Sequence, residues 1–259
     1  MIKFFRHIRQ NLIMKNKTGK YFKYAIGEII LVVIGILIAL QINNFNESRK
    51  LEKSKQSLML ALKNELIENK NSLNRFSLEL NKRNSKFNKV LRYSVGDYTI
   101  PDDSLKYYIS NMVYERTLST LNSVQEEAIN SGKFEMLSDT LKQSLSLLKD
   151  YTNSRKSLDD ISIEILNFNS NYALDKIVAI LSILPVIPDE LSSHPIVPKH
   201  PEFLLSNKDL STLLKNPKTY LILNKIYLLY ATDEVWIKHG LLKVTENTID
   251  LIDEELNTL

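Results

Sequence analysis

The apolar stretch IILVVIGILIAL, from Ile29 to Leu40, decides how this chain is built. Ten of its twelve residues are aliphatic, and only Gly35 and Ala39 interrupt them. Extended to Tyr24–Ile42, the stretch has nineteen residues. As a helix it would span about 28 Å, close to the ~30 Å hydrocarbon thickness of a bilayer. The ten aliphatic side chains favour insertion by roughly 3–6 kcal/mol, and Glu28 lies near the end, where a carboxylate costs less. We therefore predict a transmembrane helix over residues 24–42.

Two other interpretations of this stretch are less favourable. A cleaved signal peptide would have an unusually long basic region, and no A-x-A-like cleavage site comes after the apolar run. Cleavage after Ala39, for example, would put Leu37 at the −3 position. A buried core helix would carry a polar face, which this run lacks. The sequence favours an uncleaved anchor.

The charges that flank the span predict its orientation. Residues 1–23 carry seven basic residues and no acidic one, whereas four basic residues lie closely after the span: Arg49, Lys50, Lys53 and Lys55. Because the more basic flank stays in the cytoplasm, we predict a cytoplasmic N-terminus. In a bacterium, the span would then lie in the inner membrane and residues 43–259 would form a periplasmic domain. The absence of cysteine suits that oxidising compartment, and it excludes disulfides, thiolate zinc sites and a cysteine nucleophile.

The basic arm over residues 1–23 has two open interpretations. One helical face would carry four apolar residues: Ile2, Phe5, Ile8 and Leu12. The arm could be an interfacial helix on an anionic leaflet, or only a basic flank that sets topology. Within the span, Gly35 and Ala39 form a small-xxx-small pair that would let two spans approach closely, although such pairs are common by chance.

The remainder of the chain shows no bias towards nucleic acid. Residues 46–259 hold 27 basic and 29 acidic residues, so the basic character belongs to the N-terminal arm alone. A content of 44% hydrophobic residues excludes a disordered chain, and only six glycines and seven prolines disfavour an all-β fold.

After the span, the apolar residues have a helical period. Ten positions from 59 to 90 alternate steps of three and four, and eight of them are apolar: Met59, Leu62, Leu66, Leu73, Phe76, Leu80, Phe87 and Val90. Asn69 and Arg83 are the exceptions. This pattern predicts a long helix that continues from the membrane helix and ends near Gly96.

Further helices are expected after this turn. We predict a short helix capped by Asp102 or Asp103, a second over Thr120–Ser131 with Gly132 just past its end, and long helices that begin at Ser138 or Asp139 and at Pro217. The stripe of the first long helix is Leu141, Leu145, Leu148, Tyr151, Leu158, Ile161, Ile165, Phe168 and Tyr172; that of the last is Leu223, Tyr227, Tyr230, Ile237, Leu241, Val244 and Leu251. The predicted fold class is all-α, with the transmembrane helix followed by an elongated helical bundle.

Two segments do not fit the bundle pattern. Ile177–Leu184 is almost entirely apolar but too short to span a bilayer, so we expect buried core, with a docking patch as the alternative. Residues 185–201 hold five of the seven prolines and form either a structured loop or an extended segment offered to a partner.

The stretch KTGKYFKYAIGEIILVVIGILIALQINNFNESRK, Lys17–Lys50, resembles the opening of a bacterial family of uncharacterised single-pass membrane proteins. EEAINSGKFEMLSDTLKQSL, Glu126–Leu145, is similar to that family's second recurring element. Phe45 stands where the family usually has tryptophan. The resemblance implies a membrane location and a helical domain outside the membrane, and it implies no activity.

Candidate chemical sites are weak. The proline-rich loop holds five residues of types that bind zinc, without a spacing that would fix their geometry: Asp189, Glu190, His194, His200 and Glu202. Adjacent acids, such as Glu126 and Glu127, point about 100° apart on a helix and do not converge on a substrate. A pocket could be lined by Tyr220, Tyr227, Tyr230 and Trp236, although such side chains usually belong to the core.

From these observations we predict a protein that is not an enzyme, with no catalytic, cofactor-binding or metal-binding residues. The first hypothesis is a membrane-anchored structural or interaction protein that presents its helical domain to a protein partner or to itself. The alternative is a periplasmic ligand-sensing module that acts through a partner subunit. Its partners would be the lipid bilayer and a protein, and not nucleic acid.

Overall fold

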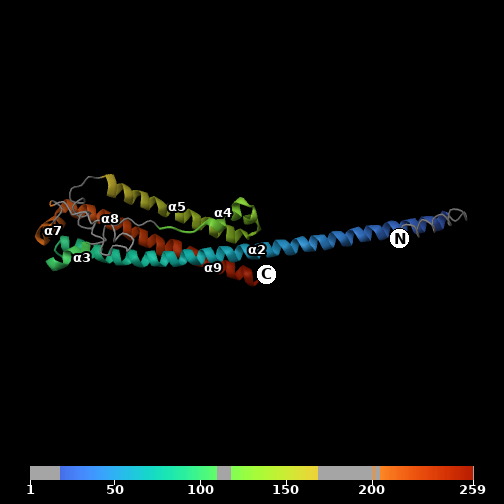
Figure 1. The fold of residues 1–259 in the computed structure, drawn as a ribbon, viewed down its shortest axis with the longest axis horizontal. Helices are drawn as coiled ribbons and strands as arrows, with labels where there is room; N and C mark the ends of the chain where they lie inside the picture. Colours follow the sequence, from blue (N-terminus) through green and yellow to red (C-terminus); the bar gives the residue numbers. More distant parts are fainter. Residues whose placement is uncertain (1–17, 110–117, 169–200, 202–204, 259) are drawn as a thin grey trace, which may run out of the picture. The chain divides into compact units, whose positions relative to one another are not determined.

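The computed structural model describes residues 18–109, 118–168, 201 and 205–258, and they are helical with no β-strand (Figure 1). The chain forms two units, Met1–Ser57 and Leu58–Leu259. Helix α2 (Thr18–Ser94) supplies the described part of the first unit and the first element of the second. This confirms the prediction of an all-α protein with a long apolar N-terminal helix followed by further helices.

The second unit is a helical bundle. After α2 come the short helices η1 (Asp102–Ser104), α3 (Leu105–Ile109), α4 (Ser123–Asn130) and η2 (Lys133–Met136). The bundle continues with α5 (Asp139–Phe168), α7 (Asn207–Leu214), α8 (Pro217–Val235), the π-helix η5 (Trp236–Leu241) and α9 (Leu242–Asn257). Helix α5 packs against both α8 and α9.

The core consists of two clusters that share the apolar stripe of α2. One joins Leu58–Leu66 of α2 to α4, α5 and α9, and it contains the buried Met59, Leu62, Leu141 and Ile252. The other joins residues 73–93 of α2 to α3, α7, α8 and η5. Seven of the eight apolar positions predicted on α2 are buried, and Phe76 is half-buried. Leu148 of α5 packs against both clusters.

The ends of several helices are explained by local sequence. Gly96 adopts a φ of 82°, in the left-handed region, and its amide and that of Asp97 donate to the last carbonyls of α2. Gly132, with a φ of 72°, ends α4 in the same conformation. The Ser138 hydroxyl accepts from the amide of Leu141 at the start of α5, and Pro217 occupies the first turn of α8. These four boundaries match the sequence predictions.

Two predicted helix starts are wrong, one for a local reason and one because of a contact with a distant residue. Asp102 and Asp103 do not cap a helix: they lie inside the 3₁₀ turn η1, directly after Pro101, and are exposed. Helix α4 begins at Ser123 rather than Thr120, because the backbone of Leu121 is held outside the helix. Its amide and carbonyl both bond to the side chain of Asn69 on α2, at 2.7 Å each.

The last long helix contains a π turn that the sequence analysis missed. The predicted stripe is confirmed as far as Leu241. Beyond it the buried residues are Thr245, Thr248 and Ile252, and the predicted Val244 and Leu251 are half-buried. Thr245 and Ile252 each lie one position after a predicted residue. In α5, the predicted stripe holds as far as Leu158, and Ile161 is 42% exposed.

Phe87 lies on the α2 seam, the buried apolar stripe of α2 from Leu58 to Leu91, and a substitution at this residue tests that assignment. Its side chain is fully buried against the rings of Tyr227 and Tyr230, with ring centroids 6.1 and 5.9 Å away. We expect Phe87→Ala to lower the free energy of unfolding by about 3–5 kcal/mol, because it leaves a cavity that the helices cannot close. Leu78→Ala is the control: Leu78 is 64% exposed on the same helix, so little change is expected. Denaturant unfolding of the full chain in detergent measures both, and equal effects would contradict the assignment of the seam.

Candidate functional site

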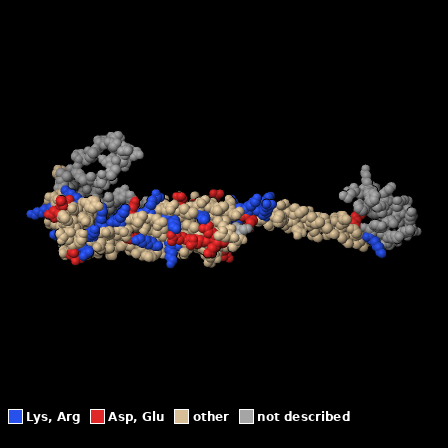
Figure 2. Space-filling view, turned by 90° about the horizontal axis from the view of Figure 1, so that it is seen from below, with Lys and Arg blue, Asp and Glu red and all other residues tan. Residues whose placement is uncertain are grey.

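The first candidate site is the apolar N-terminal part of α2. Its aliphatic side chains from Ile29 to Ile42 are about half to two-thirds exposed on every side of the helix. Figure 2 shows this stretch as a surface without charge, with charged side chains at both ends. Within the described part of the chain, α2 is the one helix long and apolar enough, by length and composition, to cross a membrane.

The ends of this stretch are polar. Before the stretch, Lys23 is exposed and Glu28 is half-buried. After it, three basic residues are exposed: Arg49, Lys50 and Lys53. Asn43 donates to the carboxylate of Glu47 one turn later at 3.2 Å. A Cβ placed on Gly35 would meet no atom within 4 Å, so the face with the small residues is open in this chain.

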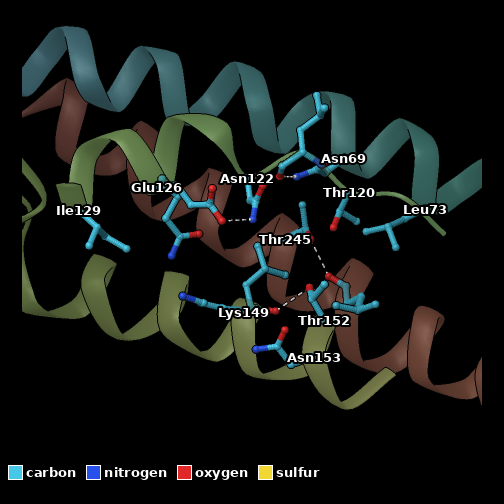
Figure 3. Close-up of a pocket in the computed structure, with 14 residues that line it drawn as sticks. Asn69, Leu73, Thr120, Asn122, Glu126, Ile129, Lys149, Thr152, Asn153 and Thr245 are labelled. Atoms are coloured by element: carbon cyan, nitrogen blue, oxygen red, sulfur yellow. Dashed lines mark hydrogen bonds between the residues drawn. The ribbon is translucent and has the colours of Figure 1, made fainter. Parts of the chain in front are cut away.

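The second candidate site is a cavity of about 190 Å³ inside the second unit. It lies among α2, the segment before α4, α4 itself, α5 and the start of α9 (Figure 3). Its lining combines apolar and polar side chains: Asn69, Leu73, Thr120, Leu121, Asn122, Gln125, Glu126, Ile129, Leu148, Lys149, Thr152, Asn153, Leu241 and Thr245. Neither the sequence pattern nor the predicted aromatic pocket indicated this position.

Hydrogen bonds within the chain hold the wall of this cavity. Asn69 uses its side-chain amide to bond the backbone of Leu121. Asn122 donates to the Glu126 carboxylate at 2.6 Å, and the hydroxyl of Thr245 donates to the Leu241 carbonyl at 2.7 Å. Lys149 is exposed and has no hydrogen bond or ion pair with any residue that the structure describes. Among the described residues, the cavity therefore has fixed walls and an uncommitted cation at its edge.

A buried ion cluster joins α5 to α8. The guanidinium of Arg155, 3% exposed, donates to Asp233 at 2.8 and 3.0 Å and to Asp159 at 2.9 Å twice. It also lies 5.0 Å from the ring centroid of Phe76 on α2. Burial lowers the pKa of Arg155, but the hydrogen bonds and charge of Asp233, helped by Asp159, outweigh this and leave it raised. Arg155 stays charged and fully paired, so the cluster has a structural role.

Two carboxylates in this region have pKa values shifted in opposite directions. Burial raises the pKa of Asp159, and the attraction of Arg155 does not offset it. Burial also acts to raise the pKa of Glu234, but hydrogen bonds from Lys238, Asn81 and Asn84 outweigh it, so this pKa is lowered. Asn81 and Asn84 belong to α2, so Glu234 ties α8 to that helix.

The candidate residues from the sequence do not come together as a site. Tyr230 is buried against Phe87, and Tyr220 and Tyr227 pack against the same cluster. Trp236 packs edge-on against Tyr151, with centroids 5.4 Å apart. Tyr230 thus belongs to the core, and Tyr220 and Tyr227 are half-buried against it, which agrees with the core interpretation rather than with the alternative of an aromatic pocket.

The metal hypothesis and the two unusual segments lie outside the described residues. This applies to Asp189, Glu190, His194, His200 and Glu202, to Ile177–Leu184, and to residues 185–200 of the proline-rich loop. Across the portion that the structure does describe, no group of three or more His, Asp or Glu side chains could hold a metal ion.

Comparison with known proteins connects part of α2 to an uncharacterised family. Residues 28–100 match the model of a family of unknown function (DUF6090). No curated protein and no solved structure matches the chain. The matched range holds the apolar stretch, the buried stripe of α2 and the turn that follows this helix, as far as Ile100. The expected similarity to an uncharacterised family is confirmed at this level. The basic opening before residue 28 and the element at Glu126–Leu145 lie outside the match.

Asp159 and Glu234 form a matched pair for a pH test, since their side chains are 17% and 15% exposed. A raised pKa in the folded state means that the contribution of Asp159 to stability is full at low pH and is lost as the pH rises through that pKa. The contribution of Glu234, whose pKa is lowered, is present at higher pH and is lost as the pH falls.

We therefore expect opposite pH profiles for the two neutral variants. As the pH rises across the acidic range, Asp159→Asn gains stability relative to the wild type, and Glu234→Gln loses it. Unfolding midpoints of the full chain in detergent, measured at a series of pH values, give the comparison. Parallel profiles for the two variants would contradict it.

Proposed function

We propose that this chain is a single-pass protein of a bacterial inner membrane. Its arm over residues 1–23 lies in the cytoplasm, residues 24–42 cross the bilayer, and residues 43–259 form a periplasmic helical domain. The observation that carries the proposal is the stretch Ile29–Ile42, whose aliphatic side chains are exposed on every face of α2. Water is a poor solvent for such a surface, whereas lipid tails bury all of it.

The orientation rests on the basic residues that flank the span. Seven precede residue 24, and four lie at positions 49–55. In the bundle, by contrast, buried apolar residues of several helices pack together in two core clusters, as expected of a domain in water. No catalytic role is part of this proposal.

Leu37→Arg tests the anchor. An arginine near the centre of the span costs about 2.5–3.5 kcal/mol of insertion free energy, comparable to the whole driving force of the aliphatic residues. We expect this variant to be extracted from membranes by alkaline carbonate or degraded, while the wild type remains in the pellet. Leu51→Arg, outside the span on the same helix, is the control and should behave as the wild type.

Reporter fusions in cells check the orientation. Alkaline phosphatase, which is active only outside the cytoplasm, should be active at the C-terminus and inactive at residue 15. Extraction of the wild type by carbonate would overturn the anchor, and equal cytoplasmic signals at both positions would overturn the orientation.

We further propose that the helical domain binds a protein partner or a second copy of itself. Three apolar residues lie seven apart on α8, at the spacing of a coiled-coil seam, and each is more than half exposed among the described residues: Leu221, Leu228 and Val235. An exposed apolar row of this kind supports helix-on-helix docking.

Leu228→Glu tests this docking row. In membrane vesicles treated with an amine-reactive crosslinker, the wild type should give a discrete larger species. The charge at Leu228 should abolish that species, because a carboxylate would be buried in the seam. Leu147→Glu, at an exposed apolar residue of α5, is the control and should leave it unchanged. A wild-type protein that remains monomeric and without a partner would contradict the interaction role.

A ligand-sensing role that acts through a partner subunit is the second candidate function. The observation that favours it is the cavity beside α4 and α5, whose lining has both charged and apolar parts.

A further inference from the structure

We propose that the cavity among α2, α4, α5 and α9 binds a free aliphatic α-amino acid. This inference rests on the ligand-sensing role proposed above for the same cavity and names its ligand, and it does not depend on the interaction role. It rests on the construction of the cavity wall, on two opposite charges along its rim, and on its size and apolar lining.

The interior wall of the cavity includes a polar side chain. Leu241, the last residue of the π turn η5, lines the cavity, and Thr245 follows it one helical turn later in α9. Thr245 is fully buried and faces the cavity (Figure 3). Its hydroxyl donates to the Leu241 carbonyl and keeps its oxygen as an acceptor.

Gly240 of the π turn lies close to two rings. A Cβ on this glycine would lie 3.4 Å from the Tyr151 ring and 3.5 Å from the Trp236 ring, at ordinary van der Waals distance. The next residue, Leu241, lines the cavity directly.

The rim carries a cation and an anion on different helices. Lys149 projects from α5 and has no partner among the described residues, so its ammonium can bind a carboxylate. Glu126 projects from α4, and its carboxylate accepts a hydrogen bond from Asn122 that fixes its position. Figure 3 shows Glu126 beside α4 in the upper half of the view and Lys149 beside α5 in the lower half. A molecule with both a carboxylate and an ammonium group would satisfy both.

The remaining lining selects an aliphatic group of limited size. Leu73, Leu148 and Leu241 supply apolar surface, and none of the described residues that line the cavity is aromatic, so these residues give a sugar ring no platform for stacking. The volume of about 190 Å³ equals that of about six water molecules in the liquid. This is below the range of about 300–1,000 Å³ that is typical for drug-sized ligands, and it suits a single amino acid.

Calorimetric titration of the full-length protein in detergent tests the proposal with three matched probes. L-Leucine carries both charges, isovalerate lacks the ammonium group, and isopentylamine lacks the carboxylate. We expect leucine to bind at least about tenfold more tightly than either of the others, because each loses one charge-assisted hydrogen bond. No binding of leucine at millimolar concentrations, or equal binding of isovalerate or isopentylamine, would overturn the proposal.

Variants at the exposed rim locate the binding site without disturbing the core. Lys149→Gln should weaken leucine and isovalerate about tenfold and leave isopentylamine unchanged. Glu126→Gln, which keeps an acceptor for Asn122, should weaken leucine and isopentylamine and leave isovalerate unchanged. Lys156→Gln, on an exposed part of α5 away from the cavity, is the control. Leucine binding that both rim variants leave intact would place the ligand elsewhere and overturn the assignment.

Discussion

The bundle depends on one apolar seam along α2, from Leu58 to Leu91. Both core clusters take α2 as one wall, and the other long helices of the second unit bury their stripes against these clusters. A long helix with alternating steps of three and four cannot bury that seam by itself, so α5, α8 and α9 are required to cover it. Polar residues on or beside the seam then fix where each neighbour lies: Asn69 holds the segment before α4, and Asn84 holds Glu234 of α8.

The departures from regular helix occur where polar groups enter the core. In α5 and α8, Arg155 and Asp233 occupy positions of the buried stripe and satisfy one another. In α9, Thr245 and Thr248 are buried, and their hydroxyls donate to carbonyls of the preceding turn, at Leu241 and Val244. Thr248 also shares a hydrogen bond with Ser144 of α5 at 2.7 Å. Each of these buried groups thus has a partner, as a low-dielectric interior demands.

The sequence predicted the fold from features that are local. Regular spacing on α2, the glycines after two helices and Pro217 each act within a few residues, so helix class and four boundaries could be derived without tertiary information. Contacts between distant segments could not. The role of Asn69 depends on the backbone of Leu121, 52 residues away, and nothing in the spacing of α4 signals that Thr120 stays outside the helix.

The candidate cavity was missed for a related reason. The apolar pattern leads from Leu241 to the apolar residue three positions later, whereas the residue that faces the cavity is the polar Thr245, which is four residues from Leu241 and lies on the same side of the helix. A clue was present in the sequence, since a strict stripe required Glu234 at a core position while Asp233 lay one residue away. Arg155, which falls at a stripe position of α5, was a similar clue that a charged residue lies in the core. Charged residues at stripe positions in two helices are best explained by a mutual pair.

The two parts of α2 differ in how their apolar residues are arranged around the helix axis. Between Ile29 and Ile42 apolar residues surround the axis, whereas from Leu58 onwards they keep to one side and alternate with Asn, Lys and Glu. An all-round apolar surface cannot be covered by helices on one face, and a one-sided stripe would leave polar groups in lipid. The change of pattern falls between residues 42 and 58, where charged residues first appear after the apolar stretch. The contact pattern divides the chain at the end of that interval, between Ser57 and Leu58.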